Sequence, residues 1–311
     1  MGTTTFDPGL TQQYGAPLRR IIEKDGRFNV LRRGTTWRDL HPYLYLIDAR
    51  WPWFLALLFL SYLAANTVFA LVYYLLGPGT LAGGDAPTAW GRFLNAFFFS
   101  AHTLSTVGYG SIAPKSTSAN LVAAFEAMAG LMGFAVATSL LYGRFSRPSA
   151  RLGFSESILI SPYRDRTGLQ FRIVNRRANA LMEVEAKVLL MTVEGAPGNL
   201  KRTYHTLTLE RSSIHFLALT WTVVHPIDDE SPLAGLTASD LARLQAEFLI
   251  LIKAYDETFS QVVHARYSYR YEEVLWARRF APAFHVDPLG DLVLDIEQVG
   301  TLVPVESETA V

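Results

Sequence analysis

Two long apolar runs dominate the first half of the chain. Residues 51–76 contain no charged side chain, and a helix of about 20 apolar residues is enough to cross the hydrocarbon core of a bilayer. Residues 119–142 form a second run, which includes Glu126 and many small residues that let membrane helices pack closely. The pattern therefore predicts two membrane-spanning helices.

The segment between the two runs has a different pattern. A loop rich in Gly and Pro covers residues 77–87, and a further apolar run follows at residues 93–104. This run is too short to cross a membrane, so its length indicates a re-entrant half-helix. Irregular backbone at membrane depth survives only where it is buried in protein or lines a water-filled path. The order of span, half-helix, loop and span therefore indicates a pore.

The half-helix is followed directly by Thr106, Val107, Gly108, Tyr109 and Gly110. This string is the selectivity-filter sequence of potassium channels, in which backbone carbonyls replace the hydration shell of the ion. Gly108 and Gly110 permit backbone angles that point successive carbonyls to one side, and the Thr106 hydroxyl adds oxygen atoms at the inner end. We expect Val107 and Tyr109 to point away from the pore and to pack around the filter.

The motif also predicts a ligand and an assembly. Potassium, as the permeant ion, is expected at the oxygen atoms of Thr106, Val107, Gly108 and Tyr109, with no other cofactor. A filter needs four such loops and the chain has one, so the motif predicts a homotetramer. The C-terminal end of the half-helix directs partial negative charge toward the cavity, which favours a cation.

Basic residues are distributed unevenly around the two predicted spans. The first span is preceded by Arg19, Arg20, Lys24, Arg27, Arg32, Arg33, Arg38 and Arg50. The second span is followed by Arg144, Arg147 and Arg151, whereas the segment between the spans holds only Arg92 and Lys115. The positive-inside rule then predicts that both termini lie in the cytoplasm.

Composition excludes several classes of protein. The chain has 28 basic and 28 acidic residues, so no net charge favours a nucleic-acid partner. The histidines show no metal-ligand spacing, and the absence of cysteine rules out disulfides and zinc–thiolate sites. No combination of nucleophile, base and metal ligands stands out, and no glycine-rich phosphate loop follows a predicted strand. We therefore expect neither an enzyme nor a dinucleotide-binding domain.

The second half of the chain reads as a soluble β domain. Apolar or alternating runs between turn signals predict strands at residues 171–174, 184–193, 204–209, 216–224 and 248–254. Residues 237–245 predict a short helix with Thr237 as its N-cap. The acidic residues Asp228, Asp229, Glu230, Asp256 and Glu257 either line a cytoplasmic vestibule that concentrates cations or form a solvated acidic loop.

Several segments outside the filter resemble the inward-rectifier potassium channel family, and most of all its bacterial members. They are NTVFA at residues 66–70, RFSRP at 144–148, FRIVNRR at 171–177, WTVVHPIDDESPL at 221–233 and EEVLWARRF at 272–280. Eukaryotic members carry two cysteines around the pore loop, and this chain has none. The resemblance implies a multi-pass channel of the bacterial inner membrane with an α+β fold: two transmembrane helices, a re-entrant pore helix and filter, and a cytoplasmic immunoglobulin-like β-sandwich.

The resemblance also gives the expected domain boundaries. They are a cytoplasmic N-terminal segment at residues 1–34, an amphipathic slide helix at 35–48, a transmembrane pore domain at 49–148 and the β-sandwich domain at 149–311. The spacing of Trp37, Leu40, Leu44 and Ile47 is compatible with a helix lying along the membrane surface. Pro42 is expected to kink or restart this helix.

One face of the second span carries the candidate cavity and gate. At 100° per residue, Ala127, Leu131, Phe134, Thr138 and Tyr142 share this face. In the family pattern, Tyr142 matches the bulky position at the cytoplasmic bundle crossing, and Phe134 matches the cavity position that carries an acid in strong rectifiers. The resemblance therefore implies that Phe134, Thr138 and Tyr142 line the pore, whereas the other interpretation is packing against a neighbouring helix.

Three further residues of the pore domain stand out. Glu126 lies off the pore face, and a carboxyl at membrane depth usually has a function, so we expect it to support the filter through a hydrogen bond. Gly130 matches the presumed hinge of the family, or serves close packing alone. We expect His102 in the half-helix to be a packing residue.

Basic residues near the inner leaflet predict a lipid partner. Arg38, Arg144 and Arg147 are expected there, and each basic residue near the surface contributes about 1 kcal/mol toward anionic lipid. The plain interpretation is membrane anchoring, and the resemblance implies lipid-linked gating as well.

Two other functions compete with this interpretation. One is a potassium channel of another two-span family, gated by a ligand of the C-terminal domain. The other is a cation transporter subunit, although such a subunit needs several pore loops in one chain, and only one is present here.

Overall fold

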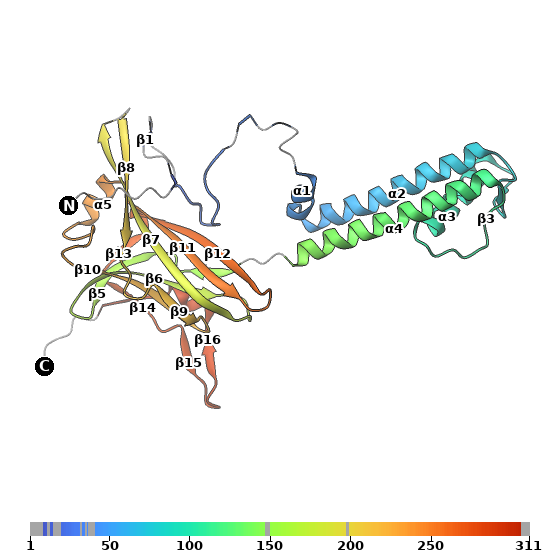
Figure 1. Cartoon of the computed structure of the whole chain (residues 1–311). Coiled ribbons are helices and arrows are strands. Elements are labelled where there is room, and N and C mark those ends of the chain that lie inside the picture. The colour runs from blue at the N-terminus through green and yellow to red at the C-terminus, as the bar shows by residue number, and fades with distance from the viewer. Residues whose placement is uncertain are drawn as a thin grey trace. The chain divides into compact units, whose positions relative to one another are not determined.

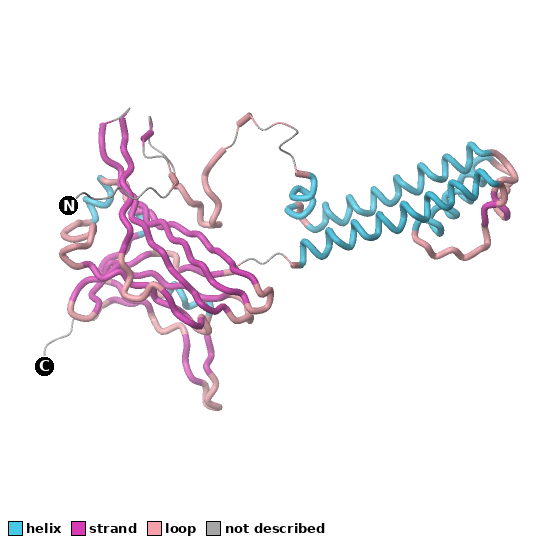
Figure 2. Tube along the Cα trace, in the orientation of Figure 1, coloured by secondary structure: helices cyan, strands magenta, loops and turns pink. Residues whose placement is uncertain are grey.

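The computed structural model describes residues 9–10, 13–14, 20–31, 33–34, 36, 41–146, 150–196 and 199–305. The chain divides into two compact units. Helices make up the unit Arg32–Arg147, and strands dominate the unit formed by Met1–Leu31 and Pro148–Val311 (Figures 1 and 2). Each unit is described by itself.

The helical unit consists of α1 (Pro42–Asp48), α2 (Trp51–Leu76), β2 (Leu81–Ala82), α3 (Ala89–Leu104), β3 (Ala113–Pro114) and α4 (Thr117–Phe145). Helices α2 and α4 are long and apolar enough to cross a membrane, which confirms the two predicted spans. Both α3 and α4 begin earlier than predicted because polar residues cap them. The Thr88 side chain accepts a hydrogen bond from the Gly91 amide at 3.0 Å, and Ser116 does the same for Ala119 at 3.1 Å.

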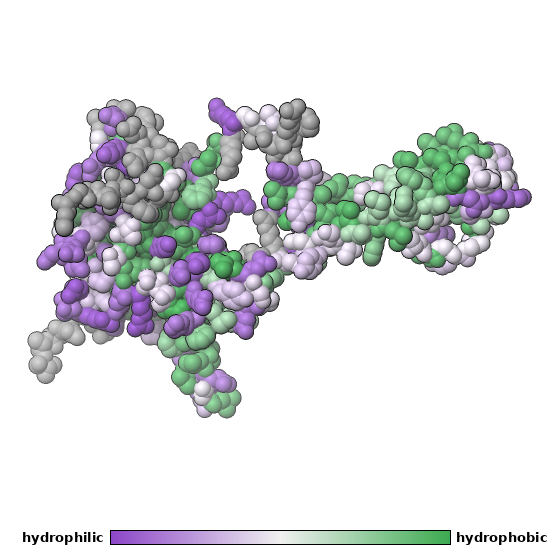
Figure 3. Space-filling view, viewed as in Figure 1, coloured by the Kyte–Doolittle hydropathy of each residue, from purple (hydrophilic) through white to green (hydrophobic). Residues whose placement is uncertain are grey.

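Helix α3 packs against the C-terminal end of α2 and the N-terminal part of α4. The small core that joins them contains Ala70, Tyr73, Leu81, Ala96, Phe99 and Ala119, and the rings of Tyr73 and Phe99 meet edge to face at 5.0 Å. Most other apolar side chains of α2 and α4 are exposed, and the space-filling view shows a largely hydrophobic surface over this unit (Figure 3). Such a surface requires lipid or further protein to cover it.

The predicted slide helix is only partly described. Helix α1 begins at Pro42, where the missing amide of proline is tolerated, and ends at Asp48. Residues 35 and 37–40, and with them Trp37, Arg38 and Leu40, lie outside the described residues.

The strands of the other unit form two main sheets. One has the order β1 (Gln13–Tyr14), β8 (Asn199–Leu207), β7 (Leu181–Ala196), β11 (Glu247–Asp256) and β12 (Gln261–Arg270), with β9 (Ser213–Phe216) also on β7. The other has the order β10 (Thr220–Ile227), β6 (Arg166–Asn175), β5 (Ile158–Tyr163) and β13 (Val274–Trp276), with β4 (Leu152–Phe154) on β6. Side chains from both sheets, such as Phe171 and Phe248, share one core. This arrangement confirms the predicted β-sandwich.

Smaller elements complete this unit. They are α5 (Ala238–Arg243), the 3₁₀ turns η2 (Tyr271–Glu273) and η3 (Ile296–Gly300), and two antiparallel two-stranded sheets, β14 (Arg278–Phe280) with β17 (Leu302–Pro304) and β15 (Phe284–Val286) with β16 (Leu292–Leu294). Thr237 caps α5, as predicted, and a reciprocal hydrogen bond from its amide to Asp240 makes a capping box. Hydrogen bonds from Thr237 lower the pKa of Asp240 to about 2.

The predicted strand at residues 216–224 is wrong, because the chain changes sheets within it. Strand β9 pairs with β7 in one sheet, and β10 pairs with β6 in the other. Leu217 lies in the crossing and is buried in the shared core. The apolar run is therefore continuous in the sequence although two strands share it.

Residues 20–31 of the N-terminal segment pack on β11 and β12. The amide of Ile21 donates to the buried Glu247 carboxylate at 3.0 Å, and Ser268 donates to the Ile22 carbonyl at 2.7 Å. Burial raises the pKa of Glu247, and the hydrogen bonds that its carboxylate accepts from Ser268 and from the Ile21 and Ile22 amides oppose that shift only in part. Residues 20–31 are thus part of the β unit in the fold.

Candidate ion-conduction site

The predicted filter lies at the C-terminal end of α3 and has an unusual backbone. Thr106, Gly108 and Gly110 have positive φ angles of 60°, 57° and 79°, whereas Val107 and Tyr109 between them do not. Such alternation turns successive peptide planes so that their carbonyls face the same side. A left-handed non-glycine residue costs roughly 1–2 kcal/mol, so the conformation of Thr106 needs support from its surroundings.

Helix α3 supplies this support. The amides of Val107 and Gly108 both donate to the His102 carbonyl, at 2.9 and 3.1 Å, and the Thr106 amide donates to Thr103 at 3.0 Å. The His102 ring meets the Tyr109 ring edge to face at 4.8 Å. His102 therefore packs against the filter and holds its backbone as well, a role that the sequence did not indicate.

The side chains of the filter are largely uncovered within one chain. Val107 is 53% exposed and Tyr109 is 74% exposed. Large apolar side chains next to a strained backbone need packing partners, and the part of the chain that the structure describes supplies none on the open side.

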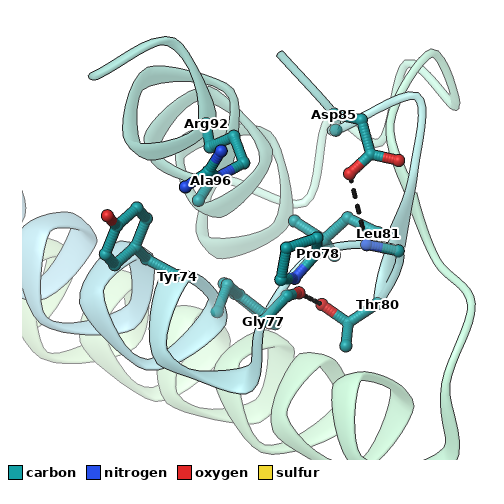
Figure 4. A pocket seen from close by; sticks show the side chains of 11 residues that line it. Tyr74, Gly77, Pro78, Thr80, Leu81, Asp85, Arg92 and Ala96 are labelled. Carbon is teal, nitrogen blue, oxygen red and sulfur yellow. Dashed lines mark hydrogen bonds between the residues drawn. The ribbon is translucent and has the colours of Figure 1, made fainter. Parts of the chain in front are cut away.

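The loop after α2 is held by its own hydrogen bonds (Figure 4) and pairs with the segment that follows the filter. Within the loop, Thr80 donates to the Gly77 carbonyl at 2.8 Å, and Asp85 accepts from the Gly79 amide at 3.2 Å. Strand β2 pairs with β3 just beyond the filter. A Cβ atom on Gly83 would lie 2.4 Å from the Ser111 carbonyl oxygen, so glycine permits this close approach.

Glu126 lies within a buried polar cluster behind the filter. Tyr73 of α2 donates to one carboxyl oxygen at 2.7 Å, and Ser100 of α3 donates to the other. Ser100 also lies 3.1 Å from the amide oxygen of Asn66. All four side chains are at most 1% exposed, and among the described residues no Lys, Arg or His forms an ion pair with Glu126. The cluster joins α2, α3 and α4.

Gly130 lies where α4 crosses the end of α3. A Cβ atom at this position would lie 2.1 Å from the Leu104 carbonyl oxygen, which is closer than any real contact. The structure therefore gives Gly130 a packing role beside the filter, and the hinge role stays a prediction.

The predicted pore face of α4 is left open by the chain's own elements. Phe134 is 75% exposed and Tyr142 is 73% exposed, and Leu131 and Thr138 are exposed as well, while Ala127 is half-buried. The lining of the pore by these residues remains a prediction.

Arg144 has protein partners at the end of α4. Its guanidinium donates to the carbonyls of Leu46, Ile47 and Ala49, at 2.5, 2.9 and 2.6 Å. The sequence had placed this side chain toward lipid. Of the other two predicted lipid-facing residues, Arg38 and Arg147 both lie outside the described residues.

The acidic residues of the β unit are not equivalent. Asp228, Asp229, Glu230 and Glu257 are exposed, whereas Asp256 is 1% exposed. Asp256 accepts hydrogen bonds from the Thr258 and Phe259 amides, at 3.0 and 3.3 Å, and so shapes the turn after β11. The prediction that Asp256 belongs to an acidic surface is wrong because this turn buries its carboxylate.

A buried histidine anchors the loop that carries the other acids. His225 contacts the Thr208 carbonyl through Nδ1 at 2.6 Å and the Ser231 hydroxyl through Nε2 at 2.7 Å. The carbonyl can only accept, so Nδ1 carries the proton and Ser231 donates to Nε2. Burial lowers the pKa of His225.

Two apolar helices, a short helix between them and a braced filter-like loop define a membrane ion channel subunit. Residues 51–147 match a family model described as ion channel, and residues 152–311 match one described as inward rectifier potassium channel C-terminal domain.

Known proteins resemble the chain over most of its length. It is 38% identical to the inward rectifier potassium channel Kirbac3.1 of Paramagnetospirillum magnetotacticum, over 89% of this chain and 93% of that one. It is 28% identical to the ATP-sensitive inward rectifier potassium channel 14 of Homo sapiens, over 88% and 70% of the two chains. The chain therefore belongs to the inward rectifier potassium channel family, a family of membrane channels and not of enzymes. Membership of this family sets aside the two competing functions.

Proposed function

We propose that four copies of this chain form a potassium-selective pore around one filter built from residues 106–110. The observation that carries the proposal is the alternating backbone of this segment, held by three hydrogen bonds to α3. Four such loops around an axis present rings of carbonyl oxygen atoms at the spacing that replaces the hydration shell of potassium. The permeant ions bind at Thr106, Val107, Gly108 and Tyr109, and no other cofactor takes part.

The exposed side chains of the filter and of α4 support the tetramer. In the assembly, Val107 and Tyr109 pack against neighbouring subunits, and Phe134 and Thr138 of α4 line the central cavity. Glu126 supports the filter from behind, through α3. The pore lies in the bacterial inner membrane with both termini in the cytoplasm, as the distribution of basic residues indicates.

Four copies of Tyr142 form the gate where the C-terminal ends of the four α4 helices converge. A ring of aromatic side chains can block a hydrated ion or expel water from the constriction. Anionic lipid modulates this gate through basic residues at the inner leaflet, Arg38 and Arg147. Tyr142→Ala is expected to raise resting flux, and unchanged resting flux in this variant would place the gate elsewhere.

Rubidium uptake into liposomes that contain the purified protein tests the filter. The wild type is expected to take up rubidium in a barium-sensitive manner. Gly108→Ala is expected to abolish this uptake without preventing insertion, because an alanine at a φ of 57° is strained. Undiminished selective uptake by Gly108→Ala would overturn the filter assignment.

A further inference from the structure

The C-terminal end of α1 is capped by a residue from another helix. The last carbonyls of a helix have no partner within it, and α1 has no basic residue of its own in its last turn. Arg144 of α4 donates to two of these carbonyls, those of Leu46 and Ile47, and to the carbonyl of Ala49 just beyond. A cation at a helix C-terminus also interacts favourably with the helix dipole.

Two aromatic rings hold the same guanidinium. Its central carbon lies 4.6 Å from the ring centre of Trp51 and 4.5 Å from that of Phe54, both at the start of α2. The Nε atom is buried too, although it has no hydrogen-bond partner among the described residues. Both terminal nitrogens and the flat face of Arg144 thus contact protein, which leaves little of the group for a lipid headgroup.

The neighbouring residue lets α1 approach α4 closely. A Cβ atom on Gly143 would lie 2.8 Å from the Tyr43 hydroxyl oxygen and 3.2 Å from Cδ1 of Ile47. Gly143 and Arg144 therefore make one junction, in which the glycine allows contact with α1 and the arginine fastens the end of α1.

We infer that Arg144 is a positioning residue that fixes α1 to the Tyr142 end of α4, and not a ligand for lipid headgroups. The link is rigid because a planar guanidinium reaches three carbonyls at once, so a displacement of α1 along the membrane surface moves the helix end that carries Tyr142. This inference rests on the proposed gate at Tyr142. The residue that senses lipid is then a different one, and Arg144 transmits its effect.

Two substitutions distinguish the effect of the charge of the Arg144 side chain from the effect of its shape. Arg144→Lys keeps the positive charge but cannot bridge three carbonyls or stack in the same way, and Arg144→Gln removes the charge. Rubidium uptake is measured in liposomes of zwitterionic lipid with increasing fractions of phosphatidylglycerol. We expect both variants to lose most of the lipid-induced change in flux, while the lipid fraction that gives half of the remaining change stays at the wild-type value.

The junction is also tested without any change of charge. Gly143→Ala is expected to push α1 away from α4 and to reproduce the reduced response of Arg144→Gln. Tyr43→Phe removes the nearest clashing atom. Combined with Gly143→Ala, it is expected to restore a large part of the lipid-induced change in flux. Combined with Arg144→Gln, it is expected to restore none of this change. A residue with a merely structural role gives no such selective rescue.

Three results would overturn the inference. The first is a normal response in Arg144→Lys together with a lost response in Arg144→Gln, which would make charge the important property. The second is a shift of the half-effective lipid fraction in both variants, which would make Arg144 a lipid ligand. The third is a wild-type response in Gly143→Ala. If the flux of the wild type does not change with lipid, the proposed modulation of the gate by lipid is wrong. Resting flux then tests the junction, because Arg144→Gln and Gly143→Ala must change the resting flux in the same direction.

Discussion

A substitution at Gly130 tests how α4 supports the filter. In Gly130→Ala, the new methyl group would lie 2.1 Å from the Leu104 carbonyl oxygen and 2.9 Å from its carbon. The obstructing atoms are backbone at the end of α3, so no side-chain rotation relieves the clash. Overpacking of this kind costs about 1–3 kcal/mol, whereas the better helix propensity of alanine returns only about 1 kcal/mol. We therefore expect a net loss of stability.

The clash also has a functional consequence, because Leu104 is two residues before Thr106. A displaced end of α3 moves the carbonyls that hold the filter backbone, so we expect selective rubidium uptake to fall. Thermal unfolding in detergent and rubidium uptake in liposomes measure the two effects.

The matched control is Gly133→Ala on the same helix. Among the described residues, no atom lies within 4 Å of a Cβ atom at Gly133, so this variant gains helix propensity without a clash inside the chain. We expect its melting temperature to be at or above that of the wild type. If Gly130→Ala and Gly133→Ala behave alike in both assays, the close packing of α4 on α3 does not support the filter.

Substitutions at three other positions test separate features of the protein. Glu126→Ala leaves the buried hydroxyls of Tyr73 and Ser100 without their partner, which costs about 1–3 kcal/mol of stability for each orphaned group. Glu126→Gln keeps a partner for both hydroxyls and is expected to melt at a higher temperature than Glu126→Ala. Equal melting temperatures in the two variants would contradict a stabilising role of Glu126. In the proposed tetramer, Phe134→Asp would place four carboxylates around the axis, so it is expected to deepen voltage-dependent block by magnesium or polyamines. Unaltered block would remove Phe134 from the pore lining. His225 has a folded-state pKa below its unfolded value, so its contribution to stability is complete above the unfolded pKa of about 6.5 and is lost as the pH falls. The melting temperature of the full chain is expected to fall between about pH 7.5 and pH 5.5, with a smaller fall in His225→Gln; identical slopes would refute the assignment.

The sequence predicted those features that depend on local pattern. Long stretches without charge identified α2 and α4, and the order of residues 106–110 identified the filter loop. Thr237 was recognised as a helix cap because capping requires only its immediate neighbours. These signals do not depend on which elements meet in space.

Features that depend on contacts between distant elements were missed. Tyr73, Ser100 and Asn66 sit inside apolar runs, and only the approach of α2, α3 and α4 shows that they surround Glu126. The partners of Arg144 depend likewise on the approach of α1 to α4. Asp256 looked like a surface acid because its burial arises from the turn that it shapes.

The reversal potential of single channels in planar bilayers tests most directly whether this chain forms a potassium-selective pore. With potassium on one side and an equal concentration of sodium on the other, a pore that prefers potassium tenfold shifts the reversal potential by about 59 mV. We expect a shift of at least this size toward the potassium equilibrium potential in the wild type. A reversal potential near zero, with currents still present, would contradict it.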